Sequence, residues 1–176
     1  ELGRERAHRV EPRRAQALLA VGRYPQAEVV VSNALLRSTG SIQLRMLGVD
    51  TAKASGIPSL ASLRLREINE LAGARSWAYR DPPDLLALGQ AALLLGADPK
   101  VVLEKLFGPA QKAEPQLREL YLARGELALD KNDYALAATT FTEALKKFPD
   151  DADILGGQAR AFAPSARGRM LELLEL

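Results

Sequence analysis

Apolar and polar residues alternate along most of the chain with the period of an amphipathic α-helix. In the segment 134–147, for example, Tyr134, Phe141 and Leu145 recur at i, i+7 and i+11 and would share one helical face. Short clusters of turn-forming residues separate such stretches. These clusters are Gly22-Arg23-Tyr24, Ser55-Gly56-Ile57-Pro58, Gly96-Ala97-Asp98-Pro99 and Asp130-Lys131-Asn132-Asp133. The pattern predicts a succession of helical hairpins.

The composition favours the same architecture. The chain has 176 residues, of which 47% are hydrophobic, so it can bury a substantial core. It contains 29 alanines and 31 leucines, whereas aromatic residues make up only 5%. Alanine and leucine favour helices, and the aromatic and β-branched residues that favour strands are sparse. We therefore expect an all-α fold.

The clearest hairpin lies between residues 118 and 151. Its first helix is predicted from Leu120 to Leu129, and its second from Tyr134 to Lys147, ending before Pro149. Three small residues would let the two helices approach closely. They are Gly125, Ala137 and Ala144.

This segment resembles the tetratricopeptide repeat (TPR), a helical hairpin of about 34 residues. The residues that carry the resemblance are Tyr121, Gly125, Ala137, Phe141, Ala144 and Pro149. The segment departs from the family pattern at Arg124, where leucine is usual, at Ala128, where an aromatic residue is usual, and at Asn132, where glycine often makes the turn. Asparagine tolerates the left-handed backbone of such a turn, so the last departure costs little.

The other repeats can be located in the sequence by the small residue that each first helix contains. These residues are Ala15, Gly48, Gly89, Gly125 and Ala159, at separations of 33, 41, 36 and 34. The predicted units span residues 8–41, 42–80, 82–117, 118–151 and 152–176. The resemblance thus implies a single repeat domain over residues 1–176, an all-α, right-handed solenoid of helix-turn-helix repeats.

Three irregularities are expected in this array. The separation of 41 predicts a long helix or an inserted loop near residues 76–83. Gly108-Pro109 should interrupt the second helix of the third unit. The fifth unit should begin with a helix through Leu155, Ala159 and Phe162 that breaks at Pro164, followed by a last helix from Ala166.

The resemblance implies a function in binding a peptide or helix, because the first helices of such repeats line a groove. The implied groove residues are Glu119, Leu122, Glu126, Leu129 and Asp130, then Leu86, Gln90, Leu93 and Leu94, and finally Gln16, Leu19 and Ala20. They suggest a ligand with leucine-like anchors and some positive charge. The family's carboxylate clamp uses lysine and asparagine where this chain has Leu122 and Glu126, so that binding mode is disfavoured. The alternative is that the apolar groove residues pack against neighbouring repeats.

Candidate chemistry is sparse, and we expect neither an enzyme nor a bound cofactor or metal. His8 is the only histidine and no cysteine is present. Asp150, Asp151 and Asp153, like the run from Asp81 to Asp84, are interpreted as helix caps rather than as a calcium site or an acid/base pair. The aromatic pair Trp77 and Tyr79 is expected to pack at the junction of two repeats, with anchoring of a partner as the alternative.

The charge balance argues against a nucleic-acid partner. The chain has 24 basic and 22 acidic residues, a formal net charge of +2. The N-terminal arginines, Arg4, Arg6, Arg9, Arg13 and Arg14, alternate with Glu1, Glu5 and Glu11 and indicate a solvated helix face. No apolar run approaches the ~20 residues needed to cross a bilayer. We expect a soluble protein, cytoplasmic or periplasmic.

Two further hypotheses remain from the sequence. Because the chain begins with Glu1, we expect it to be a segment of a longer protein. In that protein it could assemble an enzyme, or capture the enzyme's substrate, while the catalytic domain lies outside this segment. The apolar end of the last helix, at Met170, Leu171 and Leu174, could instead pair with a second copy of the chain.

Overall fold

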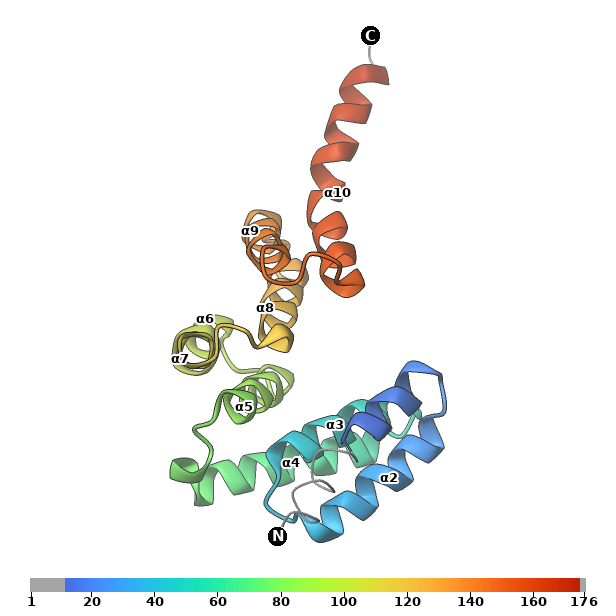
Figure 1. Cartoon of the computed structure of the whole chain (residues 1–176), viewed down its shortest axis with the longest axis vertical. Coiled ribbons are helices and arrows are strands. Elements are labelled where there is room, and N and C mark those ends of the chain that lie inside the picture. Colours follow the sequence, from blue (N-terminus) through green and yellow to red (C-terminus); the bar gives the residue numbers. More distant parts are fainter. Residues whose placement is uncertain (1–11, 175–176) are drawn as a thin grey trace. The chain divides into compact units, whose positions relative to one another are not determined.

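The computed structural model describes residues 12–174, except for the side chains of Ser76 and of residues 166–174 (Figure 1). All regular elements in this range are helical, and no strand occurs in it. The predicted all-α class is therefore confirmed. His8 and the arginines at positions 4, 6 and 9 lie outside the described residues.

The chain forms two compact units, Glu1–Ala97 and Asp98–Leu176. The boundary falls within the third predicted repeat. The first unit contains a helix over residues 12–20, α2 (Tyr24–Arg37), α3 (Ile42–Ala54), α4 (Pro58–Ala74), the 3₁₀ turn η1 (Ser76–Ala78) and α5 (Pro82–Leu94). The second unit contains α6 (Pro99–Val102), the π-helical turn η2 (Leu103–Phe107), α7 (Gly108–Ala113), α8 (Arg118–Asp130), α9 (Tyr134–Leu145) and α10 (Ala152–Leu174).

Each predicted turn contains one residue in the left-handed region. The φ angles are 74° at Gly22, 71° at Gly56, 89° at Gly96 and 58° at Asn132. In each case the next residue donates its backbone N–H to the carbonyl five positions earlier, at 2.8 to 2.9 Å. This bond defines the Schellman motif, in which a left-handed residue ends the helix and satisfies its last carbonyls. The turn residues that the sequence singled out are therefore confirmed.

Aspartate and serine side chains cap several helix starts, and the predicted cap by Asp151 is among them. Asp133 accepts the N–H of Leu136 at 3.0 Å, and Ser41 accepts that of Leu44 at 3.2 Å. Asp151 accepts the N–H groups of two residues at the start of α10, both at 3.1 Å. Asp81 stands at the N-cap of α5 but makes no side-chain cap bond.

In the first unit, α3 packs against α2, α4 and α5. The core includes Ile42 and Val49 of α3 and Ile68 of α4, all essentially inaccessible to solvent. Tyr79 is also buried here, and its hydroxyl donates to the carbonyl of Gly40 at 3.0 Å. Trp77 is 71% exposed, so the expectation that both aromatic residues would pack is wrong for Trp77. The two residues therefore do not form a packed aromatic pair.

In the second unit, the ring of Phe141 lies between two glycines. A Cβ built at Gly125 of α8 would come within 2.3 Å of the ring, and one built at Gly157 of α10 within 2.4 Å. Glycine at both places therefore lets α8 and α10 approach α9 closely enough to bury Phe141 completely. Ala137 and Ala144 are also fully buried, as predicted, whereas Tyr134 is on the exposed side of α9.

Helix α10 differs from the prediction. It is continuous from Ala152 to Leu174 across Pro164, without the expected break (Figure 1). Its buried face is formed by Ile154, Gly157 and Ala161, whereas Leu155 and Phe162 are 45% and 50% exposed. Because α10 packs on α8 and α9 and no later helix among the described residues covers its other side, the stripe of larger side chains stays open.

The segment at Gly108-Pro109 also differs from the prediction, because it does not end the helix. The N–H of Gly108 donates to the carbonyl of Leu103, five residues earlier, and η2 continues directly into α7. Proline has no N–H and its ring clashes with a carbonyl of the preceding helical turn. The wider π turn accommodates the proline, and the helix continues.

Candidate functional site

The fourth predicted repeat presents one partly exposed stripe on α8. Glu119, Leu122, Glu126 and Leu129 follow one another at intervals of three or four residues and so share one side of the helix. We call these four residues the α8 surface. The two leucines are half-buried, and Glu119 is exposed. The stripe therefore combines two aliphatic side chains with two carboxylates.

Helix α10 packs against α8 and adds charges beside the α8 surface. Arg160 donates from both terminal nitrogens to the carboxylate of Glu126, with Nη1 at 3.0 Å from Oε2. Arg118, at the start of α8, pairs with Asp151 through Nε and Nη2 and donates to Asp153 at 2.6 Å. Arg118 and Arg160 thus join α8 to α10 beside the α8 surface.

The pairing with Arg118 has an electrostatic consequence. Hydrogen bonds from its guanidinium, with those from the backbone at the start of α10, hold the pKa of Asp151 below its ordinary value, against a smaller opposing effect of desolvation. The carboxylate therefore remains charged in mildly acidic solution and keeps the beginnings of α8 and α10 joined.

The other predicted groove residues belong to the first unit. On α5, Leu86 is buried, whereas Gln90 and Leu93 are half-buried and Leu94 is exposed. In the helix over residues 12–20, Gln16 is exposed and Leu19 half-buried. Their role in binding stays a prediction, and the structure leaves little of Leu86 for a partner to touch.

The sequence analysis missed a polar network in the core of the first unit. Arg64 of α4 is buried to 4% exposure, and both of its terminal nitrogens donate to the carboxylate of Glu28 on α2. The hydroxyl of Thr51 donates to the same carboxylate at 2.7 Å, and Ser32 accepts from Arg64 at 3.1 Å. One internal ion pair therefore joins α2 and α4, and the hydrogen bond from Thr51 attaches α3 to it.

The backbone of Gly48 makes room for that arginine. A Cβ at this position would lie 1.9 Å from Nη1 of Arg64. Glycine is thus required at this position of the second repeat for a steric reason, although the sequence analysis did not identify Arg64 as the residue that requires it. The residue spacing could have revealed this contact, because Arg64 follows Gly48 by the same number of residues as Phe141 follows Gly125.

Comparisons with known proteins bear on the fold. No family model matches the chain, and no curated protein matches it either. Among solved structures, it is similar to a thermophilic TPR protein of Thermus thermophilus, with a TM-score of 0.63 and 21% sequence identity over 91% of this chain and 84% of that one. The MamA protein is a more distant match, with a TM-score of 0.49 and 12% identity over 96% of this chain and 88% of that one.

The chain is therefore a TPR-like helical repeat protein in its fold. Repeated hairpins, left-handed turn residues and small residues at the helix crossings agree with this assignment. Among the described residues, none of the helices is both long and apolar enough to cross a membrane.

Proposed function

We propose that the chain is a non-enzymatic protein-interaction module that binds a peptide or helix on the α8 surface. The observation that carries this proposal is the stripe itself. Leu122 and Leu129 lie one above the other on α8 and remain partly accessible, although other leucines of the same helix are buried. Aliphatic side chains at this spacing offer anchoring points for the apolar face of an amphipathic partner.

The charges support a partner that carries positive groups. Glu119 and Asp130 flank the leucines. Glu119 has no hydrogen bond or ion pair within the part of the chain that the structure describes, and Asp130 interacts electrostatically with Arg160. Glu126 is paired with Arg160, but both side chains are substantially exposed, at 41% and 58%. Exposed pairs contribute about 0.2–1 kcal/mol, so a lysine or arginine of a partner can replace Arg160 at small cost.

A peptide array tests the proposal directly. It should contain basic amphipathic helices with leucine at i, i+3 and i+7, with matched copies in which the leucines are replaced by serine. We expect the leucine-bearing set to bind. The double variant Leu122→Ala with Glu126→Gln should lose at least about tenfold in affinity, corresponding to ~1.4 kcal/mol.

A double variant of the same residue types provides the control. Leu63→Ala with Glu70→Gln removes an exposed leucine and an exposed glutamate from α4, outside the α8 surface. This control should bind the peptides as the unchanged chain does. Equal loss in both double variants, or equal capture of the serine copies, would refute binding at the α8 surface.

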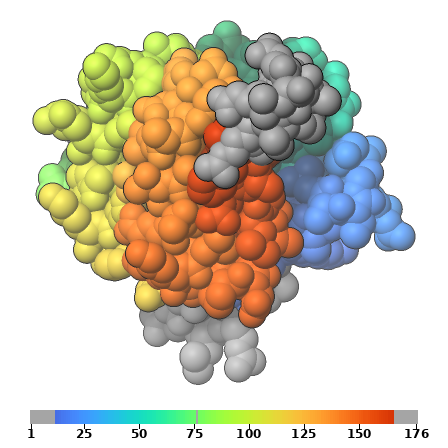
Figure 2. Space-filling view, turned by 90° about the horizontal axis from the view of Figure 1, so that it is seen from above, coloured from blue at the N-terminus to red at the C-terminus, as the bar shows by residue number. Residues whose placement is uncertain are grey.

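Self-association through α10 is a second candidate function. The side chains of Met170, Leu171 and Leu174, which the sequence analysis named for it, lie outside the described ones, so a different part of the helix is considered. The exposed residues Leu155 and Phe162 lie on one side of this helix, together with Ala159, and make an apolar stripe. Atoms of α9 and of the first part of α10 are visible next to one another in the space-filling view (Figure 2). A second copy of the chain could cover this stripe with its own.

Light scattering at several protein concentrations tests this second candidate. A mass that rises with concentration, and that returns to the monomer value in Phe162→Glu, is the expected result. A monomer at every concentration would exclude self-association, and it would leave peptide binding at the α8 surface unaffected.

A further inference from the structure

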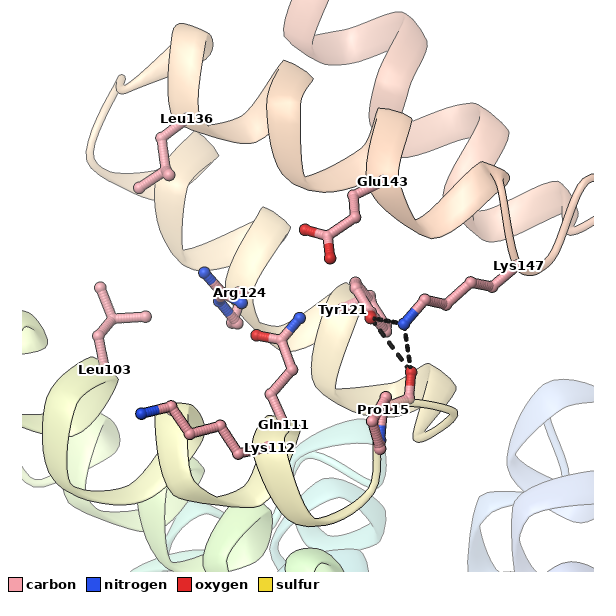
Figure 3. Close-up of a pocket in the computed structure, with 10 residues that line it drawn as sticks. Leu103, Gln111, Lys112, Pro115, Tyr121, Arg124, Leu136, Glu143 and Lys147 are labelled. Carbon is pink, nitrogen blue, oxygen red and sulfur yellow. Dashed lines mark hydrogen bonds between the residues drawn. The ribbon is translucent and has the colours of Figure 1, made fainter.

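A separate pocket lies within the second unit, between η2, α7, α8 and α9 (Figure 3). Its volume is about 490 Å³, and it opens to solvent. Arg124 is on a different side of α8 from the α8 surface, because it precedes Glu126 by two positions and a helix turns by about 100° per residue. The pocket is therefore independent of the surface proposed above.

Positive charge dominates the lining. Lys112, Arg124 and Lys147 contribute three cationic groups, against the single carboxylate of Glu143. The close-up shows Arg124 and Gln111 directed toward the middle of the pocket, and Glu143 reaching in from α9 (Figure 3). The net charge of these side chains is +2, equal to that of the entire sequence.

The ammonium of Lys147 already has hydrogen-bond partners, and these contacts form one wall of the pocket. Its ammonium donates to the carbonyl of Pro115 at 2.7 Å and to the hydroxyl of Tyr121 at 2.5 Å. It also lies 5.0 Å from the centroid of the Tyr121 ring, and that hydroxyl donates to Pro115 at 3.1 Å. These contacts join α8, the turn after α9 and the segment before α8, so one side of the pocket is preorganised.

Arg124 and Lys112, in contrast, are available to a ligand. Neither has a hydrogen bond or an ion pair with the side chains and backbone that the structure describes, although Glu143 lines the same pocket. Arg124 is half-buried, and a guanidinium that loses part of its water without gaining a partner is destabilised. A carboxylate can accept two parallel hydrogen bonds from it, which compensates for that loss.

The other end of the pocket is aliphatic. Leu103 of η2 and Leu136 of α9 line it, and Leu136 is 39% exposed. An anion without an apolar part would leave this end unused. The chemistry therefore fits an acidic side chain that is followed closely by a leucine-like one.

We propose that this pocket binds a short acidic peptide segment, whose carboxylate pairs with Arg124 and Lys112 and whose neighbouring aliphatic side chain contacts Leu103 and Leu136. Gln111 offers an amide to the same ligand. Glu143 opposes the anion at the rim and so limits the affinity.

Fluorescence anisotropy with two labelled peptides tests the proposal on the full chain. One has the sequence Gly-Glu-Leu-Asp-Glu-Leu-Gly with an amidated end, and the other has Gln and Asn in place of the acids. We expect only the acidic peptide to bind, and to bind more weakly as salt is added. Arg124→Leu should weaken binding by about tenfold or more, as expected for loss of a charged hydrogen-bonding partner.

Two further variants separate binding from folding. Glu143→Gln should tighten binding by about threefold, because it removes a repulsive charge from the rim. Lys146→Gln removes a positive charge next to the pocket residue Lys147 but does not line the pocket, so it should change binding by less than about twofold. Circular dichroism should show unchanged helix content in all three variants.

Several results would overturn the proposal. They are equal binding of the uncharged peptide, an effect of Lys146→Gln as large as that of Arg124→Leu, or no binding of the acidic peptide at all. Competition by free glutarate at the affinity of the peptide would show that the site takes a small dicarboxylate instead. The double variant Leu122→Ala with Glu126→Gln should leave this binding intact, which distinguishes the pocket from the α8 surface.

Discussion

Arg64 in the first unit and Phe141 in the second occupy equivalent places in their repeats. Each follows the glycine of its first helix at the same interval, and each fills the space that this glycine leaves open. Phe141 is buried by apolar contacts alone, whereas Arg64 needs Glu28 of α2 to neutralise its charge. The same backbone crossing is thus filled in two chemically different ways.

The first prediction concerns this buried ion pair. Glu28→Gln should destabilise the first unit by about 2–3 kcal/mol, because it leaves the guanidinium of Arg64 without a counter-charge in the core. Adding Arg64→Met to this variant should restore much of the loss, since an apolar side chain of similar length needs no partner. Hydrogen exchange of peptides from α2, α3 and α4 measures the effect in this unit. Additive losses in the double variant would contradict the coupling.

A second prediction uses two adjacent glycines of α10. Gly157→Ala should destabilise the second unit by about 1–3 kcal/mol, because the new methyl group would meet the ring of Phe141. Gly156→Ala should stabilise it by about 0.5–1 kcal/mol, because nothing lies within 4 Å of its Cβ and alanine favours a helix. Thermal unfolding followed by circular dichroism compares the two. Equal effects would show that Phe141 does not constrain this crossing.

Local features of the fold could be predicted from the sequence because they depend on neighbouring residues. Gly56 and Gly96 mark turns through their own backbone preferences, and Asn132 does so through its tolerance of positive φ. Helix periodicity and the spacing of small residues were enough to locate the paired helices of the fourth repeat. These signals act over a few residues and do not require tertiary contacts.

Features that depend on distant partners could not be predicted. Arg64 is charged and so was not expected inside, and its partner lies 36 residues away. The side of α10 that packs could not be identified from apolar character, because Leu155 and Phe162 are exposed whereas a glycine and an alanine are buried. Apolar character indicates a buried residue only where another helix is present to cover it.

The candidate sites illustrate the same limit. The resemblance to the repeat family suggested the residues of the α8 surface, and their spacing on a single helix places them on one side of it; their role in binding stays a prediction. Arg160 was not, because it reaches Glu126 from α10. The pocket could not be foreseen, although Arg124 stood out as a departure from the family pattern, because Lys112 and Glu143 approach it only after the helices have packed.

A third prediction concerns the left-handed turn after α8. Asn132→Ala should destabilise the second unit by about 1 kcal/mol, because alanine pays the steric cost of a positive φ. Asn132→Gly should be neutral to within about 0.5 kcal/mol, since glycine adopts this conformation freely. Denaturant unfolding gives both values. Lys131→Ala, at the preceding residue with φ of −92°, is the control and should have little effect.

A fourth prediction follows from the ion pair between Arg118 and Asp151. The pKa of Asp151 is lower in the folded chain than its ordinary value near 3.8, so the folded state favours the charged carboxylate. The resulting stabilisation is fully present above the unfolded pKa and is lost as the pH falls through the folded one. Because both side chains are partly exposed, we expect it to be only about 1 kcal/mol.

Asp151→Asn isolates this contribution, because asparagine keeps an oxygen that can cap α10. The variant should be less stable than the unchanged chain at neutral pH, and the difference should shrink as the pH is lowered below about 4. Unfolding free energies measured from neutral pH down to about pH 3 check this. Asp150→Asn, at an exposed neighbour without a bond to Arg118, should show no such convergence. If the difference for Asp151→Asn were the same at every pH, its cause would be the cap and not the charge, and the electrostatic joining of α8 to α10 would have to be abandoned.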